Sequence, residues 1–517
     1  MSVSFNLLDE PWLPVRLQDG RVCDLGLLEL FERAGEISAL AETAPPSLIA
    51  QYRLLLAITH RALSHTQGRW TDADRARWHQ NGLPVEAIRE YLEHWRERFW
   101  LFHPQHPFMQ VAALAEAEET RDKQKPWTQI SLASANGNAP VVFDHSCDLL
   151  PVSTSAANAI RTLLGFLQFT PGGLVKTIRD SDKAGALANT AAVMPLGTSL
   201  AQSLCLALHS PTQAGHEDLP CWEQGAPSVA QLRGEPQLAS GPNDRYTRQA
   251  RAVLLLPNEQ GQVQWIRFAA GIALADDVQA PDPMASYRAG SNSLVRLSFT
   301  EGRAFWRDLP ALLPDAEGLA AKPAAVLGWA ANLQFLLGSS EQPLLVAGLA
   351  SDQAKLLRWR YEFIGLPVAL LASVDCANEL RRQVRLAEEL FGDIRKIAAG
   401  MLAETLPDPG SKDTWARARS LFDTGPGPAL FFASAERSLG RVMCLLGIGD
   451  IDEAEALWRQ ALLAAGQAAW QVSLDGLGRS PQALRAEAKA YPRLLARLNP
   501  LRPPENNLSA VAKEARA

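Results

Sequence analysis

Apolar residues recur with two different periods along this chain, and the change of period predicts two kinds of structure. In the first two thirds, amphipathic helical stretches alternate with short apolar segments broken by proline and glycine. Beyond Pro367 the strand-like segments end, and apolar positions recur every three or four residues over long stretches. A period of about 3.6 residues places apolar side chains on one face of a helix. We therefore predict an α+β protein, with a mixed α/β domain over residues 1–367 and a helical domain over residues 368–517.

The C-terminal domain is predicted to be a four-helix bundle. Helices joined by short connections pack as antiparallel neighbours, and the connections here are short and rich in glycine and proline. Asp450 begins a capping-box sequence, and Ser480-Pro481 provides an N-cap followed by proline in the first turn. The four predicted helices cover residues 376–406, 412–446, 451–475 and 480–498.

The N-terminal domain shows helices and one clear hairpin. An amphipathic helix is expected to start at Pro45, and others are expected from about Pro84 to Trp100 and over residues 155–169. Two apolar segments, Arg251–Leu256 and Val263–Phe268, flank a turn-forming sequence and predict a β-hairpin. These elements would form the framework from which the intervening loops project.

Composition limits the classes of protein that fit. The chain has 517 residues, a net charge of −6 and six well-separated cysteines without a CxxC pair. We expect no signal peptide and no membrane partner, because no basic region precedes an apolar run and no apolar stretch reaches spanning length. These features favour the cytoplasm. The negative charge counts against a free-standing nucleic-acid binder, since such proteins usually carry a basic excess. Any contact with DNA should therefore be local.

Two small patches are the most informative features of the sequence. Thr170-Pro171-Gly172-Gly173 provides backbone without side chains, which can approach a ligand closely. Gly348 followed by Ser351-Asp352-Gln353 places a polar amide on a predicted turn between two apolar segments. Both suit a protein that reads the shallow edge of a DNA duplex and then opens it. From local sequence alone, the first patch could equally end a helix, and Ser351 or Asp352 could cap a helix starting near Ala354.

Motifs of catalysis and of metal binding have little support. A phosphate-binding loop needs glycine directly before its lysine, but Val175 stands directly before Lys176. His103 and His106 are interleaved with prolines, and no second histidine or cysteine pair lies near them in sequence. We therefore expect no enzyme activity, no cofactor and no metal site.

The ordered landmarks of this chain resemble those of CasA, the large subunit of the type I-E CRISPR Cascade surveillance complex. Each landmark is short and weak alone, but their order and spacing across nearly the whole chain make the resemblance specific. The landmarks are Asn6-Leu7-Leu8 with Trp12-Leu13-Pro14-Val15, His106–Gln110, Phe143-Asp144-His145, Gly172-Gly173, Thr247 with Gln249 and Arg251, Asp282-Pro283-Met284 with Tyr287-Arg288, and Gly348 with Asp352-Gln353.

The resemblance implies a non-catalytic subunit with nucleic-acid and protein partners. It implies recognition of the short motif flanking a target (the PAM) in double-stranded DNA from the minor groove, opening of the duplex for the guide RNA, and recruitment of a helicase-nuclease. Gly172 and Gly173 would form the loop that enters the groove, and Asp352-Gln353 would be the wedge. Phe143 and His145 match a loop that meets the guide's 5′ handle and a backbone subunit. The bundle would pack against the small subunits.

The chain departs from the family pattern where a lysine is expected to reach into the groove. Residues 271–277 contain no lysine and end in Asp276-Asp277. Arg267 and Arg288 are the nearest cations and are candidates to replace it. Lys176 begins a basic stretch that could hold phosphates, although aspartates interrupt it and a solvated helix face is the alternative.

A second class of function stays open at this stage. The acidic balance favours a structural assembly subunit of a ribonucleoprotein that does not contact DNA directly. The ordered landmarks favour the DNA-recognition subunit.

Overall fold

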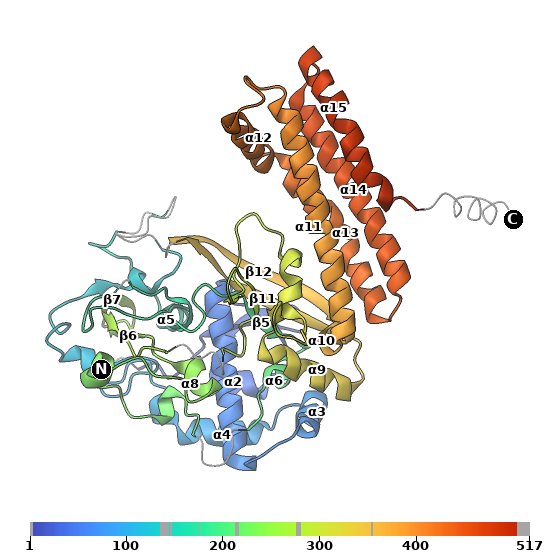
Figure 1. Ribbon diagram of the computed structural model, residues 1–517. Coiled ribbons are helices and arrows are strands. Elements are labelled where there is room, and N and C mark those ends of the chain that lie inside the picture. Colours follow the sequence, from blue (N-terminus) through green and yellow to red (C-terminus); the bar gives the residue numbers. More distant parts are fainter. Residues whose placement is uncertain are drawn as a thin grey trace. The chain divides into compact units, whose positions relative to one another are not determined.

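The chain folds as two compact units, shown in the computed structural model of Figure 1. The first unit contains residues 1–301 and 319–365, and the second contains residues 302–318 and 366–517. The fold is α+β, as predicted. The structure describes residues 4–134, 144, 147–173, 175–211, 217–275, 281–352 and 355–503, without the side chains of residues 350–358.

The strands of the first unit form small sheets. In the described residues there are four sheets of three strands each, with strand orders β2-β1-β3, β4-β7-β6, β12-β11-β5 and β10-β8-β9. The strands are β1 (Leu13–Leu17), β2 (Val22–Leu25), β3 (Ile37–Leu40), β4 (Lys125–Pro126), β5 (Ala192–Pro195), β6 (Arg251–Pro257), β7 (Val263–Ala270), β8 (Tyr287–Ala289), β9 (Leu294–Arg296), β10 (Ala321–Lys322), β11 (Glu341–Asp352) and β12 (Lys355–Pro367). The predicted hairpin over residues 251–268 is confirmed as β6 and β7.

Helix α2 (Pro45–Gln67) runs through the middle of the first unit in Figure 1. Two prolines occupy its first turn, where their missing N–H groups cost no hydrogen bond. The helix predicted to start at Pro45 is confirmed, but all residues from Pro45 to His60 are buried, so α2 is a central helix and not an amphipathic one. The other helices of this unit are α1 (Leu27–Glu32), α3 (Asp72–Asn81), α4 (Val85–His94), α5 (Ala156–Phe169), α6 (Leu200–Ala207), α7 (Val229–Arg233), α8 (Pro242–Thr247) and α9 (Ala325–Leu337), with 3-10 turns η1 (Arg96–Arg98), η2 (Ala112–Ala115), η3 (Trp127–Ile130) and η4 (Cys221–Glu223).

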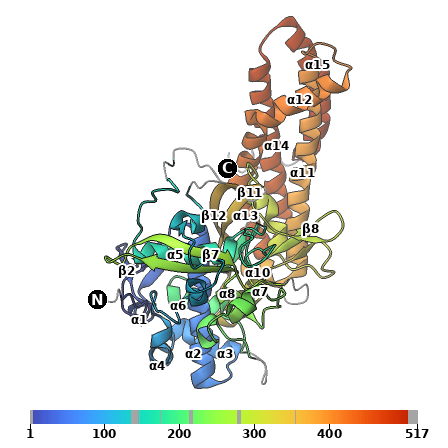
Figure 2. The same ribbon diagram turned by 90° about the vertical axis from the view of Figure 1, so that its left-hand side faces the viewer.

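The second unit is helical, and α11, α14 and α15 run side by side in Figures 1 and 2. The prediction of one helix over residues 412–446 is wrong. Gly425 is extended (φ −77°, ψ 175°) and Pro426 starts a new helix, because proline fixes its own φ and lacks the N–H that would continue the preceding helix. The helices are α10 (Val368–Ala372), α11 (Val374–Ala403), α12 (Lys412–Thr424), α13 (Pro426–Gly447), α14 (Ile451–Leu477) and α15 (Pro481–Leu498), with η5 (Phe305–Leu312) and η6 (Asn499–Leu501).

The segment 302–318 packs with the helical unit through buried aromatic contacts. Trp306 of η5 meets Trp458 edge-on, with ring centroids 5.7 Å apart. The Arg307 guanidinium lies 3.6 Å from the centre of the Phe432 ring and donates two hydrogen bonds of 2.7 Å to Glu388. Residues 302–318 therefore belong to the helical unit, although about fifty residues of the first unit separate them from its helices in the sequence. None of the helices in the described ranges combines the length and apolar character needed to cross a membrane.

Candidate nucleic-acid interface

Residues 182–195 of the first unit form backbone hydrogen bonds with each of the candidate loops. The Gly185 N–H donates to the Thr170 carbonyl at 2.8 Å, which ties this stretch to the end of α5. The Ala191 N–H donates to the Leu297 carbonyl at 2.8 Å, just beyond β9. Further along, β5 pairs with β11, with Ala192 opposite Ala347. The glycine turn, the β8–β9 hairpin and the strand leading to the wedge position therefore share one support.

The glycine turn needs glycine at both positions for different reasons. Gly173 has φ +81°, a left-handed conformation that other residues adopt only with strain. A Cβ on Gly172 would lie 3.1 Å from the Ala184 nitrogen, so the two backbones approach closely there. Both glycines are exposed. The turn thus exposes backbone without side chains.

A buried ion pair lies directly behind the glycine turn. Arg251 and Asp182 are 2.9 Å apart, and their side chains are 0% and 2% exposed. Arg251 donates to the Lys183 carbonyl at 2.6 Å and also to the Pro171 carbonyl. Burial lowers the pKa of Arg251 to about 10, while Asp182 acts in the opposite direction. The guanidinium is therefore charged at neutral pH.

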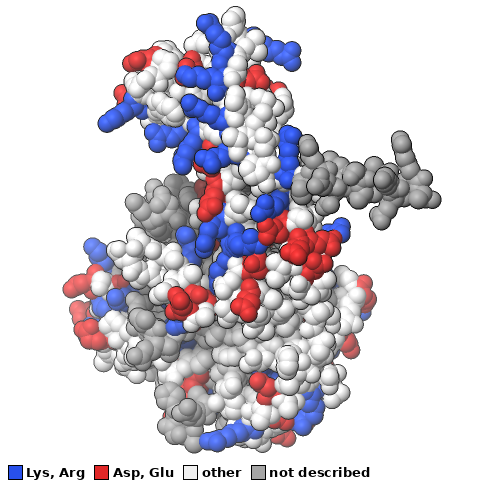
Figure 3. Space-filling model, turned by 45° about the vertical axis from the view of Figure 1, so that its right-hand side comes forward, with Lys and Arg blue, Asp and Glu red and all other residues white. Residues whose placement is uncertain are grey.

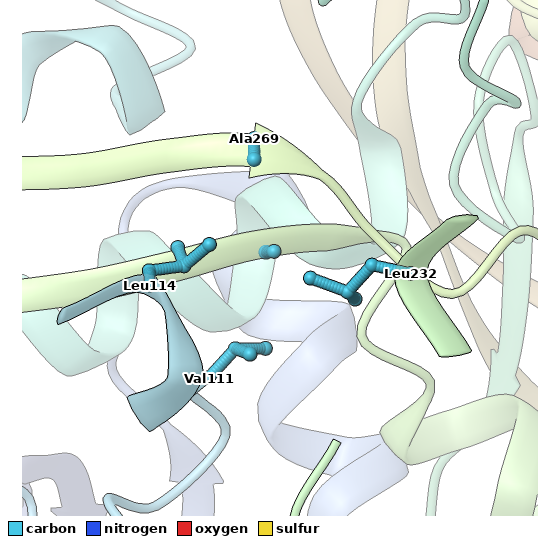
Figure 4. Packing of buried hydrophobic residues seen from close by; sticks show 5 residues of the cluster. Val111, Leu114, Leu232 and Ala269 are labelled. Carbon is cyan, nitrogen blue, oxygen red and sulfur yellow. The ribbon is translucent and has the colours of Figure 1, made fainter. Parts of the chain in front are cut away.

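The chain that follows the glycine turn is anchored at residues 178 and 179 on a small apolar cluster between η2, α7 and the β6–β7 hairpin (Figure 4). Ile178 packs against this cluster. Arg179 donates to the Leu232 carbonyl at 2.9 Å and to the Gly271 carbonyl at 2.9 Å. Arg179 thus holds the loop against the body of the unit. The cluster comprises Val111, Leu114, Leu232, Ala252 and Ala269.

Among the candidate cations, Arg288 is exposed on a rigid hairpin. It lies on β8, paired with Val295 of β9 and Ala321 of β10. The chain entering β8 is fixed by a fully buried ion pair, in which Arg53 donates to Asp282 at 3.0 and 2.9 Å. Burial alone would raise the pKa of Asp282, but Arg53, Arg245 and the Met284 N–H together hold that pKa below its ordinary value.

The other two candidate cations differ in what they contact. The Arg267 guanidinium donates to the Leu114 carbonyl at 3.1 Å and to the Ala115 carbonyl, so it ties β7 to η2. Lys176 is exposed, and its ammonium makes no hydrogen bond or ion pair with the described residues. Sequence alone could not separate these two situations, because it does not show which carbonyls lie within reach of a guanidinium.

The wedge position lies where β11 gives way to β12. Asp352 is the last residue of β11, β12 begins at Lys355, and the two strands are neighbours in one sheet. The alternative of a helix starting near Ala354 is therefore wrong, because residues from 355 pair as a strand. Gly348 is required in β11, since a Cβ there would lie 2.4 Å from the Thr190 carbonyl oxygen. Gln353 lies outside the described residues, as do Phe143 and His145.

The histidines considered as metal ligands bond to neighbouring groups instead. The His103 Nδ1 accepts the N–H of Gln105 at 3.1 Å and that of His106 at 2.9 Å. The His106 Nδ1 lies 2.9 Å from a guanidinium nitrogen of Arg98. Within the described ranges, no group of three or more histidine, cysteine or carboxylate side chains is arranged to hold a metal ion.

Charge is unevenly distributed over the helical unit. On the face drawn in Figure 3, Lys and Arg side chains gather toward one end of this unit. The exposed basic residues of α12, α15 and the turn before α15 are Lys412, Arg417, Arg419, Arg479, Arg485, Lys489, Arg493 and Arg497. The net charge of −6 therefore conceals local basic surface.

Comparison with known proteins defines the class first. A structure of Thermus thermophilus CasA (Cse1) matches with a TM-score of 0.81 and 30% identity, over 96% of this chain and 99% of that one. A chain in a structure of a CRISPR RNA-guided surveillance complex shares the fold, with a TM-score of 0.73 and 24% identity over 95% of this chain and 99% of that one. The fold is that of the large subunit of such complexes.

The sequence comparisons then give the family. The family model for CRISPR-associated protein Cse1 matches residues 6–469. CRISPR-associated protein CasA/Cse1 of Thermus thermophilus is 33% identical over 509 residues, which cover 96% of this chain and 98% of the relative. The chain belongs to the Cse1 (CasA) family, the large subunit of the type I-E Cascade surveillance complex. The resemblance inferred from the sequence landmarks is thereby confirmed.

Sequence reasoning missed two residues at this site. Asp182 was weighed only as an interruption of a basic stretch, and Arg251 only as a landmark of the hairpin. The one sequence signal was an arginine at the start of an otherwise apolar strand. A buried arginine needs a carboxylate and carbonyl partners, but the sequence does not show which carboxylate supplies them.

Proposed function

We propose that this protein is the non-catalytic subunit of a type I-E Cascade that recognises the PAM in double-stranded DNA and starts R-loop formation. The observation that carries the proposal is the exposed glycine turn, which offers bare backbone on a braced support. The minor groove is only about 6 Å wide, so a turn without side chains can approach its base edges where a bulkier one cannot.

Each candidate residue has a role in this proposal. Gly172 and Gly173 enter the groove, and Lys176 contacts a nearby phosphate. Arg288 replaces the family's lysine, in preference to Arg267, because the Arg267 guanidinium already donates to two carbonyl groups. Asp352, the last residue of β11, and Gln353 form the wedge. Unstacking one base step costs a few kcal/mol, which the carboxamide offsets in part through hydrogen bonds to exposed base edges.

The proposed partners follow from the same assignment. They are target DNA, the CRISPR guide RNA, the backbone and small subunits of Cascade, and the helicase-nuclease that the opened complex recruits. Phe143 and His145 are proposed to meet the guide's 5′ handle, since an aromatic ring and an imidazole can stack on splayed bases.

The test replaces Gly172 and Gly173 with valine in the reconstituted complex. We expect binding to a linear duplex with the preferred flanking motif to fall at least tenfold, because the added side chains keep the backbone from the base edges. Binding to single-stranded target should be unchanged, since it needs no groove recognition. Electrophoretic mobility shifts with both DNAs measure the two effects.

A matched control comes from another exposed turn. Gly20 has φ +88° and, like Gly173, open space around its missing Cβ. Gly20→Val should therefore carry similar backbone strain without affecting DNA binding. Equal duplex binding by the glycine-turn variant and the wild type would reject the proposal. It would favour instead a structural assembly subunit without DNA contact, the alternative that the net charge of −6 supports.

A further inference from the structure

We propose that Asp182, held in place by Arg251, removes the Gly173 N–H from DNA recognition and leaves the Gly172 N–H as the base-reading donor of these two glycines. The preference for particular flanking bases would then depend on a buried carboxylate that does not itself touch DNA. This inference rests on the proposed function and assigns two positioning residues to it.

The hydrogen bonds of the two glycines are unequal. The Gly173 N–H donates to Asp182 Oδ1 at 2.5 Å and lies 3.2 Å from the Asp182 carbonyl oxygen. The Gly172 N–H donates to no group in the described part of the chain. Pro171 has no N–H at all. One of the two glycine amides is therefore satisfied internally, and the other is exposed without a partner.

Arg251 explains why the carboxylate stays where it is. Its guanidinium is buried between the two sides of the loop and donates to the Pro171 carbonyl on one side and the Lys183 carbonyl on the other. It also pairs with Asp182 at 2.9 Å. The Asp182 side chain cannot turn outward without leaving a buried guanidinium uncompensated, which is strongly unfavourable.

The loop is also fixed at its far end before any DNA arrives. Ile178 has φ +74°, a conformation that a β-branched residue keeps only when its surroundings hold it, and it packs on the cluster of Figure 4. Arg179 donates to the Leu232 and Gly271 carbonyls nearby. A recognition element that is already in its bound shape loses less conformational freedom on binding.

The number of free N–H groups on the glycine turn matters because the minor groove offers few hydrogen-bonding groups that differ between base pairs. Its floor presents acceptors on every base pair, and the guanine amino group is the one donor. A single fixed N–H can be aligned with one acceptor and kept away from the guanine amino group. Without the carboxylate, the Gly173 N–H keeps only its 3.2 Å hydrogen bond to the Asp182 carbonyl. A second N–H held so weakly on a loosened turn would allow several alignments, so discrimination between flanking sequences would fall.

The experiment uses Asp182→Ala and Asp182→Asn in the reconstituted complex. Affinity is measured for a panel of linear duplexes that differ only in the flanking bases, and for the matching single-stranded target. For Asp182→Ala we expect the ratio between the best and worst duplex to shrink at least tenfold, with single-strand affinity within about twofold of wild type. Asparagine keeps an oxygen acceptor for the Gly173 N–H, so Asp182→Asn should retain most of the discrimination.

The control is a buried aspartate in the helical unit. Asp308 pairs with Arg303 at 3.1 Å and its side chain is 8% exposed, so Asp308→Asn should lower thermal stability without changing the ratio. If Asp182→Ala does not assemble, Asp182→Ser serves, since its hydroxyl is too short to reach the Gly173 N–H.

Two outcomes would overturn the inference. Either an unchanged ratio, or weakening of every duplex by the same factor, would show that the ion pair only stabilises the fold. Failure of the proposed function itself looks different. In that case the complex with valine at positions 172 and 173 would bind duplex DNA as tightly as the wild type, whatever the behaviour of the Asp182 variants.

Discussion

At the scale of single residues, the first unit buries a pair of stacked histidines. The rings of His60 and His209 lie 3.7 Å apart and nearly parallel, at 9°. The Asn243 side-chain amide lies 2.8 Å from the His60 Nδ1, close enough to donate to a neutral imidazole. Burial lowers the pKa of both rings, although Asp218, whose carboxylate lies 3.8 Å from the His209 Nε2, opposes this for His209. Both rings are therefore neutral at pH 7.

This pair should make the protein sensitive to mild acid. The folded-state pKa values lie below the ordinary 6.5, so below pH 6.5 the unfolded chain binds protons that the folded chain refuses. The stability is complete above about pH 6.5 and falls as pH drops toward the folded-state pKa values. We expect the free energy of unfolding to be lower at pH 5.5 than at pH 7.5, because the unfolded chain gains the favourable protonation of both rings.

Urea unfolding midpoints at both pH values measure this loss. His209→Gln removes one of the two titrating groups. The unfolding midpoint of this variant should therefore fall less between the higher and the lower pH than that of the wild type. His65 is exposed, and His65→Gln serves as the control. An unchanged pH dependence in His209→Gln would show that the buried rings do not cause the acid sensitivity.

At the scale of elements, the hairpin of β11 and β12 is supported by β5 along residues 344–347 of β11. β11 is held between β12 and β5. Arg360 of β12 donates to Glu362 at 2.8 Å and lies over the Phe299 ring, at 5.2 Å from its centre. These contacts fix the ends of β11 and β12 that lie away from Asp352.

Replacing Gln353 by alanine should slow R-loop formation on linear duplex by about fivefold, with complex assembly unchanged. The reason is that alanine cannot hydrogen-bond to the bases exposed when the first pair opens, and such a bond is worth about 1 kcal/mol. Stopped-flow fluorescence of labelled duplex measures the rate. Gln260→Ala, in the β6–β7 turn, is the matched control. Unchanged rates for Gln353→Ala would remove the wedge assignment.

At the scale of the whole molecule, the net charge of −6 predicts that few phosphates are neutralised directly by this subunit. Salt dependence of binding counts such contacts, because each neutralised phosphate releases condensed counterions. Lys176 and Arg288 are the two exposed cations of the first unit proposed here to contact DNA.

Changing either Lys176 or Arg288 to glutamine should reduce the slope of log affinity against log salt by about 1 for the assembled complex. Lys123 is exposed in the same unit but has no proposed contact, so Lys123→Gln should leave the slope unchanged. Titrations at several salt concentrations give the slopes. Equal slopes for wild type and both variants would place the phosphate contacts on other residues or other subunits.

The sequence by itself determined the class of fold, the family, the long helices and the β6–β7 hairpin. Hydrophobic period distinguishes long helices from short strands because each packs one face against a core. It failed between residues 412 and 446, where the pattern continues across Gly425-Pro426 although the backbone turns. It also gave no sign that residues 302–318 pack with the helices that follow them, since that choice depends on Trp306 and Arg307 finding partners far along the chain.

Only the tertiary structure decided which polar residues support the site and which face outward. In the sequence, Lys176, Arg179, Arg251 and Arg267 are simply four basic residues. In the structure, the three arginines donate to carbonyl oxygens of distant segments. Likewise, one glycine amide of the turn is satisfied by Asp182 while its neighbour makes no hydrogen bond to any described residue. The physical reason is that a hydrogen bond depends on distance and direction, and segments distant in sequence acquire these only when the chain has folded.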